Sequence, residues 1–203
     1  MRQALRRPAT WWVLLLIGLL PFVWLLGLTL QEQLGANPTE YLTRATGDWT
    51  LRSLCVVLLV TPLRVWSGWP EWLRFRRMLG LLVYFYAVLH AACYALFDMG
   101  LDLGDILADI PKRTFILVGF AAWLLLTAMA LTSFNRAIRW LGVARWQMLH
   151  RSVYAVAVLA VLHFVWMRAG KNNFAEVWVY ATVLALLLGW RVWSWARQSR
   201  RPA

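Results

Sequence analysis

The sequence predicts an all-α protein that crosses a membrane six times as a bundle of helices. Of its 203 residues, 62% are hydrophobic and 15 are tryptophan, and the mean hydropathy of +0.59 exceeds that of ordinary soluble domains. A membrane-spanning helix needs about 20 predominantly apolar residues. The chain contains several such runs separated by short charged segments, so we expect one transmembrane domain over residues 1–203.

The expected helices follow the apolar runs, because charged residues mark where each run ends. They lie near residues 11–30, 49–66, 79–97, 114–134, 146–167 and 174–195. The first run follows Arg2, Arg6 and Arg7. It is long enough for a full span and lacks a small-residue cleavage site, so we expect an uncleaved helix rather than a signal peptide.

The remaining runs differ in how strongly they indicate a span. The third and fourth contain no charged residue, and the fifth includes Arg151 near its start. In the second, only 11 uncharged residues separate Arg52 from Arg64, and in the sixth only 14 separate Glu176 from Arg191. Arginines at these ends must extend toward the lipid headgroups. A four-span arrangement remains an alternative.

The charge distribution predicts an orientation. With six spans, one side carries 15 Lys/Arg and a single acid, and the other carries 6 Lys/Arg and 8 acids. Cytoplasmic loops retain positive charge, so we expect the basic side and both termini in the cytoplasm. The net charge of +12 does not indicate nucleic-acid binding, because the basic residues lie at the ends of apolar runs. Cys55 and Cys93 lie within apolar runs, so we expect neither a disulfide framework nor a cysteine metal site.

One connection on the opposite side is acidic. Asp98, Asp102, Asp105 and Asp109 are spaced three or four residues apart, as along one face of a helix. This face could dock a basic patch on a soluble partner, or it could be an ordinary solvated loop.

The three histidines, His90, His150 and His163, all fall on expected membrane helices. Ionisable groups inside a bilayer are costly and commonly mark function. Histidines on facing helices can supply both axial ligands of a haem, and the absence of a C-x-x-C-H motif predicts a haem held without thioether bonds. For each histidine alone, a packing role or a proton relay is the alternative.

Depth in the membrane decides which histidines could share one iron. His90 lies eight residues before Asp98, and His163 lies five before Arg168, which places both in the outer half. His150 lies thirteen residues before His163, about 20 Å away along a helix and on a different face. We therefore predict a haem between His90 and His163. His150 belongs to a separate site, where it is a further candidate ligand of a haem iron.

Several segments, taken with the histidine spacing, resemble the ferric-reductase-like transmembrane family. They are VTPLR at 60–64, RRMLGL at 76–81, FYAVLH at 85–90, KRTFILVG at 112–119, LTS at 131–133, LHRSVY at 149–154 and LH at 162–163. Within that family, the chain resembles the haem-binding membrane subunits of bacterial periplasmic methionine-sulfoxide reductase systems.

The resemblance implies a location and several partners. It implies haem b, an FMN association, electrons from the quinol pool of the inner membrane and delivery to a periplasmic molybdopterin-containing subunit. Many relatives with two stacked haems carry paired histidines on the third and fifth helices, whereas Arg76 and Arg77 occupy the place about 13 residues before His90. Arginines suit a phosphate or a quinone oxygen, so we expect Arg76, Arg77 and His150 to form an inner FMN or quinone site. A role as positive-inside anchors is the alternative.

Other function classes fit the sequence less well. The longest connections are too short for a nicotinamide- or flavin-binding domain, and Walker, H-E-x-x-H and nucleophile-elbow motifs are absent. We therefore expect an electron-transfer subunit rather than a stand-alone enzyme. A histidine-based proton channel or transporter is the rival hypothesis. Such proteins commonly carry acids within spans, and here every Asp and Glu falls in or beside an expected loop.

Overall fold

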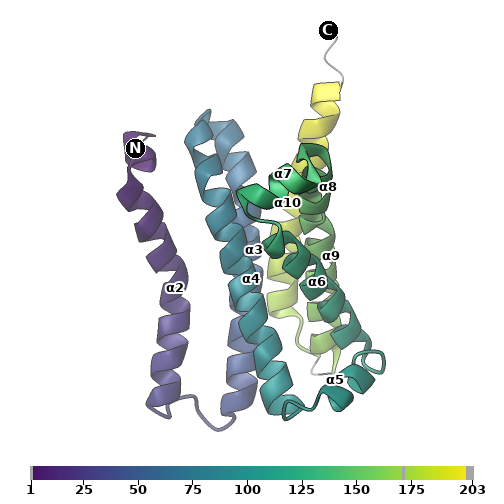
Figure 1. Ribbon diagram of the computed structural model, residues 1–203. Coiled ribbons are helices and arrows are strands. Elements are labelled where there is room, and N and C mark those ends of the chain that lie inside the picture. Colours follow the sequence, from purple (N-terminus) through teal and green to yellow (C-terminus); the bar gives the residue numbers. More distant parts are fainter. Residues whose placement is uncertain (1, 171, 200–203) are drawn as a thin grey trace.

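A computed structural model describes residues 2–170 and 172–199 and confirms the six-helix architecture (Figure 1). Six described segments are long and apolar enough to cross a membrane. In chain order the elements are α1 (Arg2–Arg6), α2 (Pro8–Leu30), α3 (Pro38–Ser67), η1 (Pro70–Phe75), α4 (Arg76–Cys93), η2 (Tyr94–Asp98), α5 (Leu103–Asp109), α6 (Thr114–Leu131), α7 (Asn135–Leu141), α8 (Val143–Arg151), α9 (Val153–Ala169) and α10 (Ala175–Ser199). Here η2 is a π-helical turn that continues α4.

The second membrane helix is longer than the apolar run predicted. It begins at Pro38 rather than near residue 49. Asn37 caps it by accepting a hydrogen bond from the Glu40 backbone nitrogen at 3.2 Å, and Pro38 occupies the first turn, where its missing N–H costs nothing. The apolar run alone did not indicate the start of α3 at Pro38, because the first three turns of this helix are polar.

The bundle has a basic end and an acidic end. The basic end carries α1, η1, α7, α8 and the last turns of α10, and the acidic end carries residues 31–37, 98–113, 170 and 172–174. Figure 1 shows α7 and α8 at the same end of the bundle as α1 and the last turns of α10, and α5 at the opposite end. The most extensive packing joins α3 to α4 and α6 to α9, and α10 packs against both α3 and α9.

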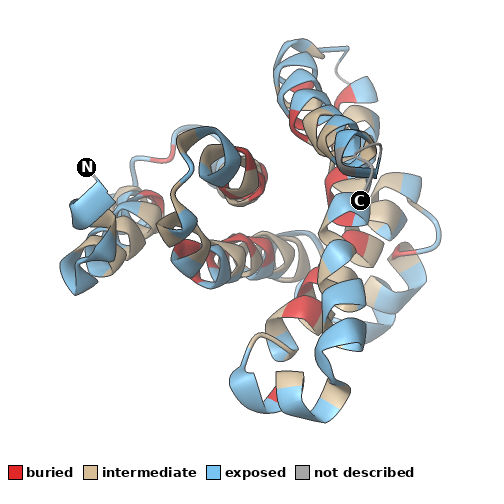
Figure 2. Ribbon diagram, turned by 90° about the horizontal axis from the view of Figure 1, so that it is seen from above, coloured by how far each residue is buried: buried red, intermediate tan, exposed pale blue. Residues whose placement is uncertain are grey.

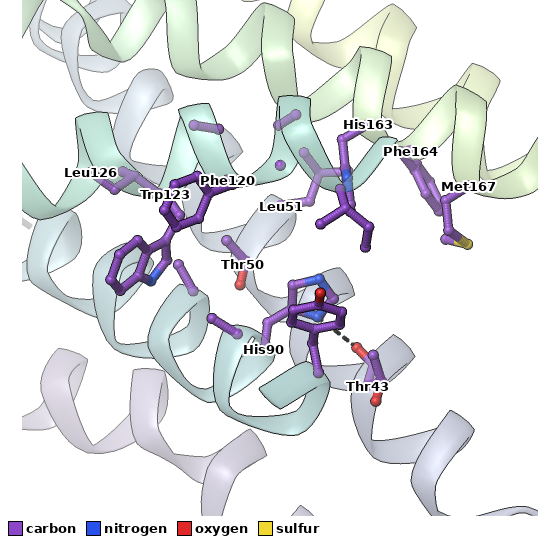
Figure 3. A pocket seen from close by; sticks show the side chains of 18 of the residues that line it. Thr43, Thr50, Leu51, His90, Phe120, Trp123, Leu126, His163, Phe164 and Met167 are labelled. Atoms are coloured by element: carbon purple, nitrogen blue, oxygen red, sulfur yellow. Dashed lines mark hydrogen bonds between the residues drawn. The ribbon is translucent and has the colours of Figure 1, made fainter. Parts of the chain in front are cut away.

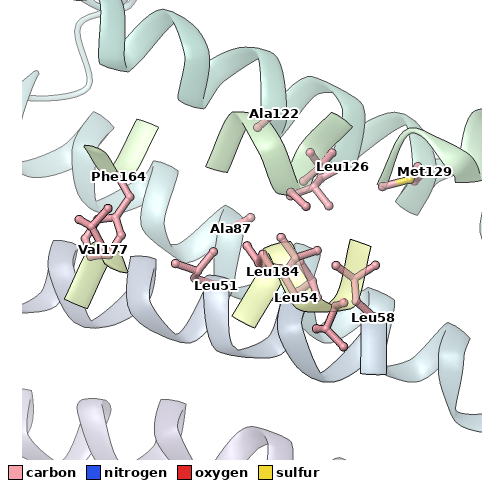
Figure 4. Packing of buried hydrophobic residues seen from close by; sticks show 14 residues of the cluster. Leu51, Leu54, Leu58, Ala87, Ala122, Leu126, Met129, Phe164, Val177 and Leu184 are labelled. Carbon is pink, nitrogen blue, oxygen red and sulfur yellow. The ribbon is translucent and has the colours of Figure 1, made fainter. Parts of the chain in front are cut away.

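A shared apolar core holds these helices together. It includes Leu54 and Leu58 of α3, Leu126 of α6, Phe164 of α9 and Leu184 of α10 (Figure 4). Seen down the bundle, buried positions lie where helices face one another and exposed positions lie on the periphery (Figure 2). The exposed positions are themselves often large and apolar, as a lipid-facing surface requires.

The first membrane helix contacts the rest of the bundle along a narrow strip. Gly18 of α2 lies so close to α4 that an added Cβ would be 2.4 Å from Leu82 Cδ1. The buried Tyr86 hydroxyl donates to the Gly18 carbonyl at 2.7 Å, and Phe22 meets Phe85 edge to face at 5.2 Å. Elsewhere α2 presents apolar side chains outward, including Leu16, which is 62% exposed.

Candidate functional site

A cavity of about 500 Å³ lies between α3, α4, α6 and α9. Its lining comes from the acidic-end halves of these helices, and nearly all of it is apolar (Figure 3). Pockets that hold drug-sized ligands and cofactors typically measure about 300–1,000 Å³. The cavity is therefore large enough for an organic cofactor.

The structure brings His90 and His163 together across this cavity. His90 extends from α4 and His163 from α9, and their ring centroids lie 6.0 Å apart with planes at 82°. His90 Nδ1 lies 2.8 Å from the Thr43 carbonyl oxygen, and His163 Nδ1 lies 2.7 Å from the Phe115 carbonyl oxygen. A carbonyl oxygen can only accept, so each Nδ1 carries the proton and each Nε2 keeps a free lone pair.

This arrangement fits a haem iron held between two imidazoles. A metal–imidazole bond is about 2 Å long, so two imidazoles on opposite sides of one metal have centroids about 6 Å apart. Metal-ligating histidines usually donate the other ring N–H to a carbonyl or carboxylate, which fixes the ring and raises its basicity. Both His90 and His163 have this support.

Two glycines make the carbonyl contacts possible. In an α-helix the carbonyl of residue i accepts from the N–H of residue i+4, and the side chain of residue i+4 covers the turn before it. Gly47 follows Thr43 by four residues, and Gly119 follows Phe115 by four. A Cβ on Gly119 would lie 2.7 Å from His163 Nδ1, and one on Gly47 would lie 3.1 Å from His90 Cε1. Both glycines therefore expose a carbonyl that then accepts two hydrogen bonds.

Charged side chains gather at the acidic-end mouth of the cavity. Arg168 lines the cavity, is only 7% exposed and forms an ion pair with Glu176 at the start of α10. Asp48 also lines it, within electrostatic range of Arg168, Glu176 and Arg52. Asp48 therefore lies inside a membrane helix, and the expectation that every acid falls in or beside a loop was wrong for it. The cause is the early start of α3.

The structure keeps His150 out of the cavity. His150 lies on α8 at the basic end, where its ring packs over Trp146 with centroids 4.1 Å apart. Its Nε2 lies 3.3 Å from the Thr132 hydroxyl. Arg76 is within electrostatic range of His150, whereas the exposed Arg77 makes no hydrogen bond or ion pair among the described residues. Two of the three residues expected at the inner site, Arg76 and His150, thus lie within electrostatic range of each other.

Sequence reasoning missed a further basic-end arginine. Arg191 of α10 donates through Nη2 to the Leu58 carbonyl at 2.6 Å and through Nη1 to the Tyr154 hydroxyl at 2.8 Å. Arg76 is within electrostatic range of Arg191, Arg64 and Tyr154. The three guanidinium groups form a cluster, and no ion pair with an acid joins it in the described part of the chain.

Two of the four loop aspartates have structural partners. Asp102 caps α5 by accepting from the backbone nitrogens of Gly104 and Asp105 at 2.7 and 3.0 Å. Asp109 accepts from the Tyr94 hydroxyl at 2.7 Å and pairs with Arg113. The Arg113 guanidinium holds the pKa of Asp109 below its ordinary value. Asp109 therefore links η2, through Tyr94, to Arg113 at the start of α6.

Comparisons with known proteins place the chain in a family. A sequence profile described as "Ferric reductase like transmembrane component" matches residues 46–161. The haem-binding subunit MsrQ of protein-methionine-sulfoxide reductase from Polaromonas naphthalenivorans is 60% identical over 97% of this chain and 90% of its own length. This chain belongs to the MsrQ family.

Other relatives agree with that placement. The MsrQ protein of Herminiimonas arsenicoxydans is 48% identical over 94% of this chain and 88% of its own length. The magnetosome protein MamZ of Magnetospirillum gryphiswaldense is 40% identical over 89% of this chain, which corresponds to 28% of MamZ. No solved structure matches. Membership of the MsrQ family and six apolar helices identify a multi-pass membrane protein.

Proposed function

We propose that the chain binds haem b between His90 and His163 and serves as the membrane electron-transfer subunit of a methionine-sulfoxide reductase system. The observation that carries this proposal is the opposed pair of imidazoles, 6.0 Å apart at their centroids in an apolar cavity of about 500 Å³. The printed names of the MsrQ relatives, which call them haem-binding subunits, support it. Haem supplies one-electron redox chemistry when its iron is held by two imidazoles.

The residues of the chain set the conditions for that chemistry. The carbonyls of Thr43 and Phe115 hold the two rings through Nδ1 and leave each Nε2 unprotonated. Those hydrogen bonds raise the basicity of the ligating nitrogens, which favours the oxidised iron. The apolar lining excludes water and lowers the local dielectric, which favours the reduced iron by destabilising net charge. The balance of these two influences sets the redox potential.

An inner site at the basic end completes the proposal. Arg76 with the neighbouring His150 offers cationic and hydrogen-bonding groups for the phosphate of FMN or the oxygen of a quinone. Arg77, the next residue along α4, adds a second positive charge at this end. His150 lies thirteen residues from His163 along α8 and α9, about 20 Å at the helical rise. Two redox sites separated by about this distance can carry electrons across a bilayer core about 30 Å thick.

The direction of transfer follows from the charge of the two ends. We propose that the basic end and both termini face the cytoplasm, that the protein resides in a bacterial inner membrane and that quinol supplies the electrons. The His90–His163 pair lies in the acidic half of the bundle, which favours delivery to a periplasmic partner. By analogy with the family, that partner is a molybdopterin-containing catalytic subunit.

The first experiment is an absorbance spectrum of the purified protein, oxidised and dithionite-reduced. We expect a Soret band that His90→Ala and His163→Ala each abolish, while His150→Ala, the matched control outside the cavity, retains at least half of it. A protein from haem-replete cells without a Soret band would refute the electron-transfer function. Proton flux through liposomes in that case would favour the channel hypothesis.

A second experiment tests the inner site. The double variant Arg76→Gln with Arg77→Gln should slow haem reduction by a soluble quinol at least tenfold and leave the dithionite-reduced spectrum unchanged. Arg136→Gln with Arg139→Gln on α7 removes the same charge from the same end and should not slow it. Equal rates in both double variants would show that Arg76 and Arg77 act only as membrane anchors.

A further inference from the structure

Arg168 is the most deeply buried arginine of the bundle's acidic half. It lies at the last turn of α9, five residues after His163, and is 7% exposed. A guanidinium is charged at all accessible pH values, and its removal from water is costly unless its N–H groups are paired. The partners of Arg168 therefore decide what role it can have.

The known contacts of Arg168 leave part of its guanidinium unpaired. Nη2 forms the ion pair with Glu176, and the carbon of the guanidinium lies 5.3 Å from the centre of the Phe164 ring. Nε is buried and has no hydrogen-bond acceptor among the described residues. The side chain of Glu176 is 54% exposed, so its charge is shared with solvent. Arg168 thus has a buried donor that no group of the described residues satisfies.

That donor borders the same cavity as the two histidines. Arg168 and His163 both line it, about one and a half helical turns apart on α9. One other buried donor on the cavity wall, Trp123 Nε1, also lacks a partner, but it is neutral and its isolation costs less. A ligand of this cavity with an anionic group near its acidic-end mouth would satisfy Arg168.

We propose that Arg168 binds a propionate carboxylate of the haem. Resting on the proposed function, this assignment deepens it by naming the residue that orients the macrocycle. A carboxylate is the acceptor that guanidinium N–H groups match best. The propionates then point toward the acidic-end mouth, and the apolar edge of the ring points toward the Ala122 and Leu126 side of the cavity.

The substitution Arg168→Gln tests this role in the purified holoprotein. An uncompensated propionate stabilises the ferric over the ferrous state, so we expect the ratio of ferrous to ferric affinity to fall about tenfold, which is 59 mV for one electron. Transfer of haem to excess apomyoglobin should accelerate about tenfold. Arg52→Gln is the charge control, because Arg52 lies at the same end but donates to Tyr180 outside the cavity wall.

Glu176→Gln separates propionate binding from a merely structural ion pair. If Arg168 only ties α9 to α10, Glu176→Gln and Arg168→Gln remove the same contact and must accelerate haem transfer to the same extent, which would overturn the proposal. If Arg168 binds the propionate, Glu176→Gln frees the guanidinium and leaves haem transfer as slow as in the wild type or slower. Arg168→Lys should recover part of the loss.

A chemical test needs no variant. Haem dimethyl ester carries no propionate charge, so the wild-type protein reconstituted with it should release it about tenfold faster than haem. Equal release of the ester and of haem, or a wild-type potential in Arg168→Gln, would refute the proposal while the histidine site stands. A wild-type protein without any Soret band would instead refute the proposed function and this inference with it.

Discussion

His163 Nδ1 lies 2.7 Å from the carbonyl oxygen of Phe115, and the glycine four residues after Phe115 is what leaves that carbonyl accessible. The same construction joins His90 to Thr43 through Gly47. Two helix pairs, α3 with α4 and α6 with α9, therefore present one imidazole each by the same local device. The site depends on residues that have no side chain as much as on the histidines.

Gly119→Ala should disrupt the site more than Gly47→Ala does. The new Cβ on Gly119 would lie 2.7 Å from His163 Nδ1, closer than real Cβ atoms approach, whereas a Cβ on Gly47 would lie 3.2 Å from His90 Nδ1. Overpacking of this kind costs about 1–3 kcal/mol. We expect Gly119→Ala to lose most of the Soret absorbance per protein and Gly47→Ala to lose less.

The matched control for both is Gly189→Ala on α10. An added Cβ there meets nothing within 4 Å, and alanine is the better helix former by about 1 kcal/mol. Its absorbance should equal that of the wild type and its melting temperature should not fall. A Gly119→Ala protein with a full Soret band would show that His163 is held differently.

Tyr86→Phe should loosen α2 without altering the site. The substitution removes the hydrogen bond from the Tyr86 hydroxyl to the Gly18 carbonyl, which contributes about 1 kcal/mol. Tyr84→Phe is the control, because the Tyr84 hydroxyl has no hydrogen-bond partner in the part of the chain that the structure describes. Thermal unfolding in detergent should show a lower melting temperature only for Tyr86→Phe. A shifted haem spectrum would contradict the separation of α2 from the cavity.

Arg191→Met should destabilise the basic end of the bundle. Arg191 joins α10 to α3 through the Leu58 carbonyl and to α9 through the Tyr154 hydroxyl, and hydrogen bonds from a charged donor contribute about 1.5–3 kcal/mol. The exposed Arg197 on the same helix packs over Trp193 and makes no hydrogen bond or ion pair with the described residues, so Arg197→Met should change stability by less than about 0.5 kcal/mol. Equal melting temperatures of the two variants would contradict this role.

The Asp109–Arg113 pair should make stability depend on acid pH. Because the pKa of Asp109 is lower in the folded protein than the ordinary 3.8, the folded state binds fewer protons. The stabilisation is complete above about pH 4 and is lost as the pH falls through the lower folded value. The difference in melting temperature between wild type and Asp109→Asn should therefore shrink from pH 6 to pH 3. Asp105→Asn, which removes no ion pair of the described residues, should show a small difference at both values.

The number of spans and the pairing of His90 with His163 could be predicted, because hydropathy and depth depend only on sequence distance. The first turns of α3 could not be predicted from hydropathy, because their residues are polar. The helix nevertheless begins there, where Asn37 caps it. The carbonyl acceptors carry no sequence signal of their own, although an isolated glycine inside an apolar helix, as at Gly119, marks a close approach. Arg168 was assigned to a helix end by its charge, and only the packing of α9 against α10 shows that it is buried.

The carbonyl contacts of His90 and His163 also bear on how a cofactor enters. Both imidazoles already have fixed rotamers before any ligand arrives. Ordering one free side chain on binding costs about 0.5–1.5 kcal/mol. In this protein the two imidazoles are already ordered on folding, so binding does not carry that cost. We therefore expect the affinity of the proposed haem site to reflect ligation and burial almost directly, and haem loading to be limited by passage into the cavity rather than by a search among side-chain conformations.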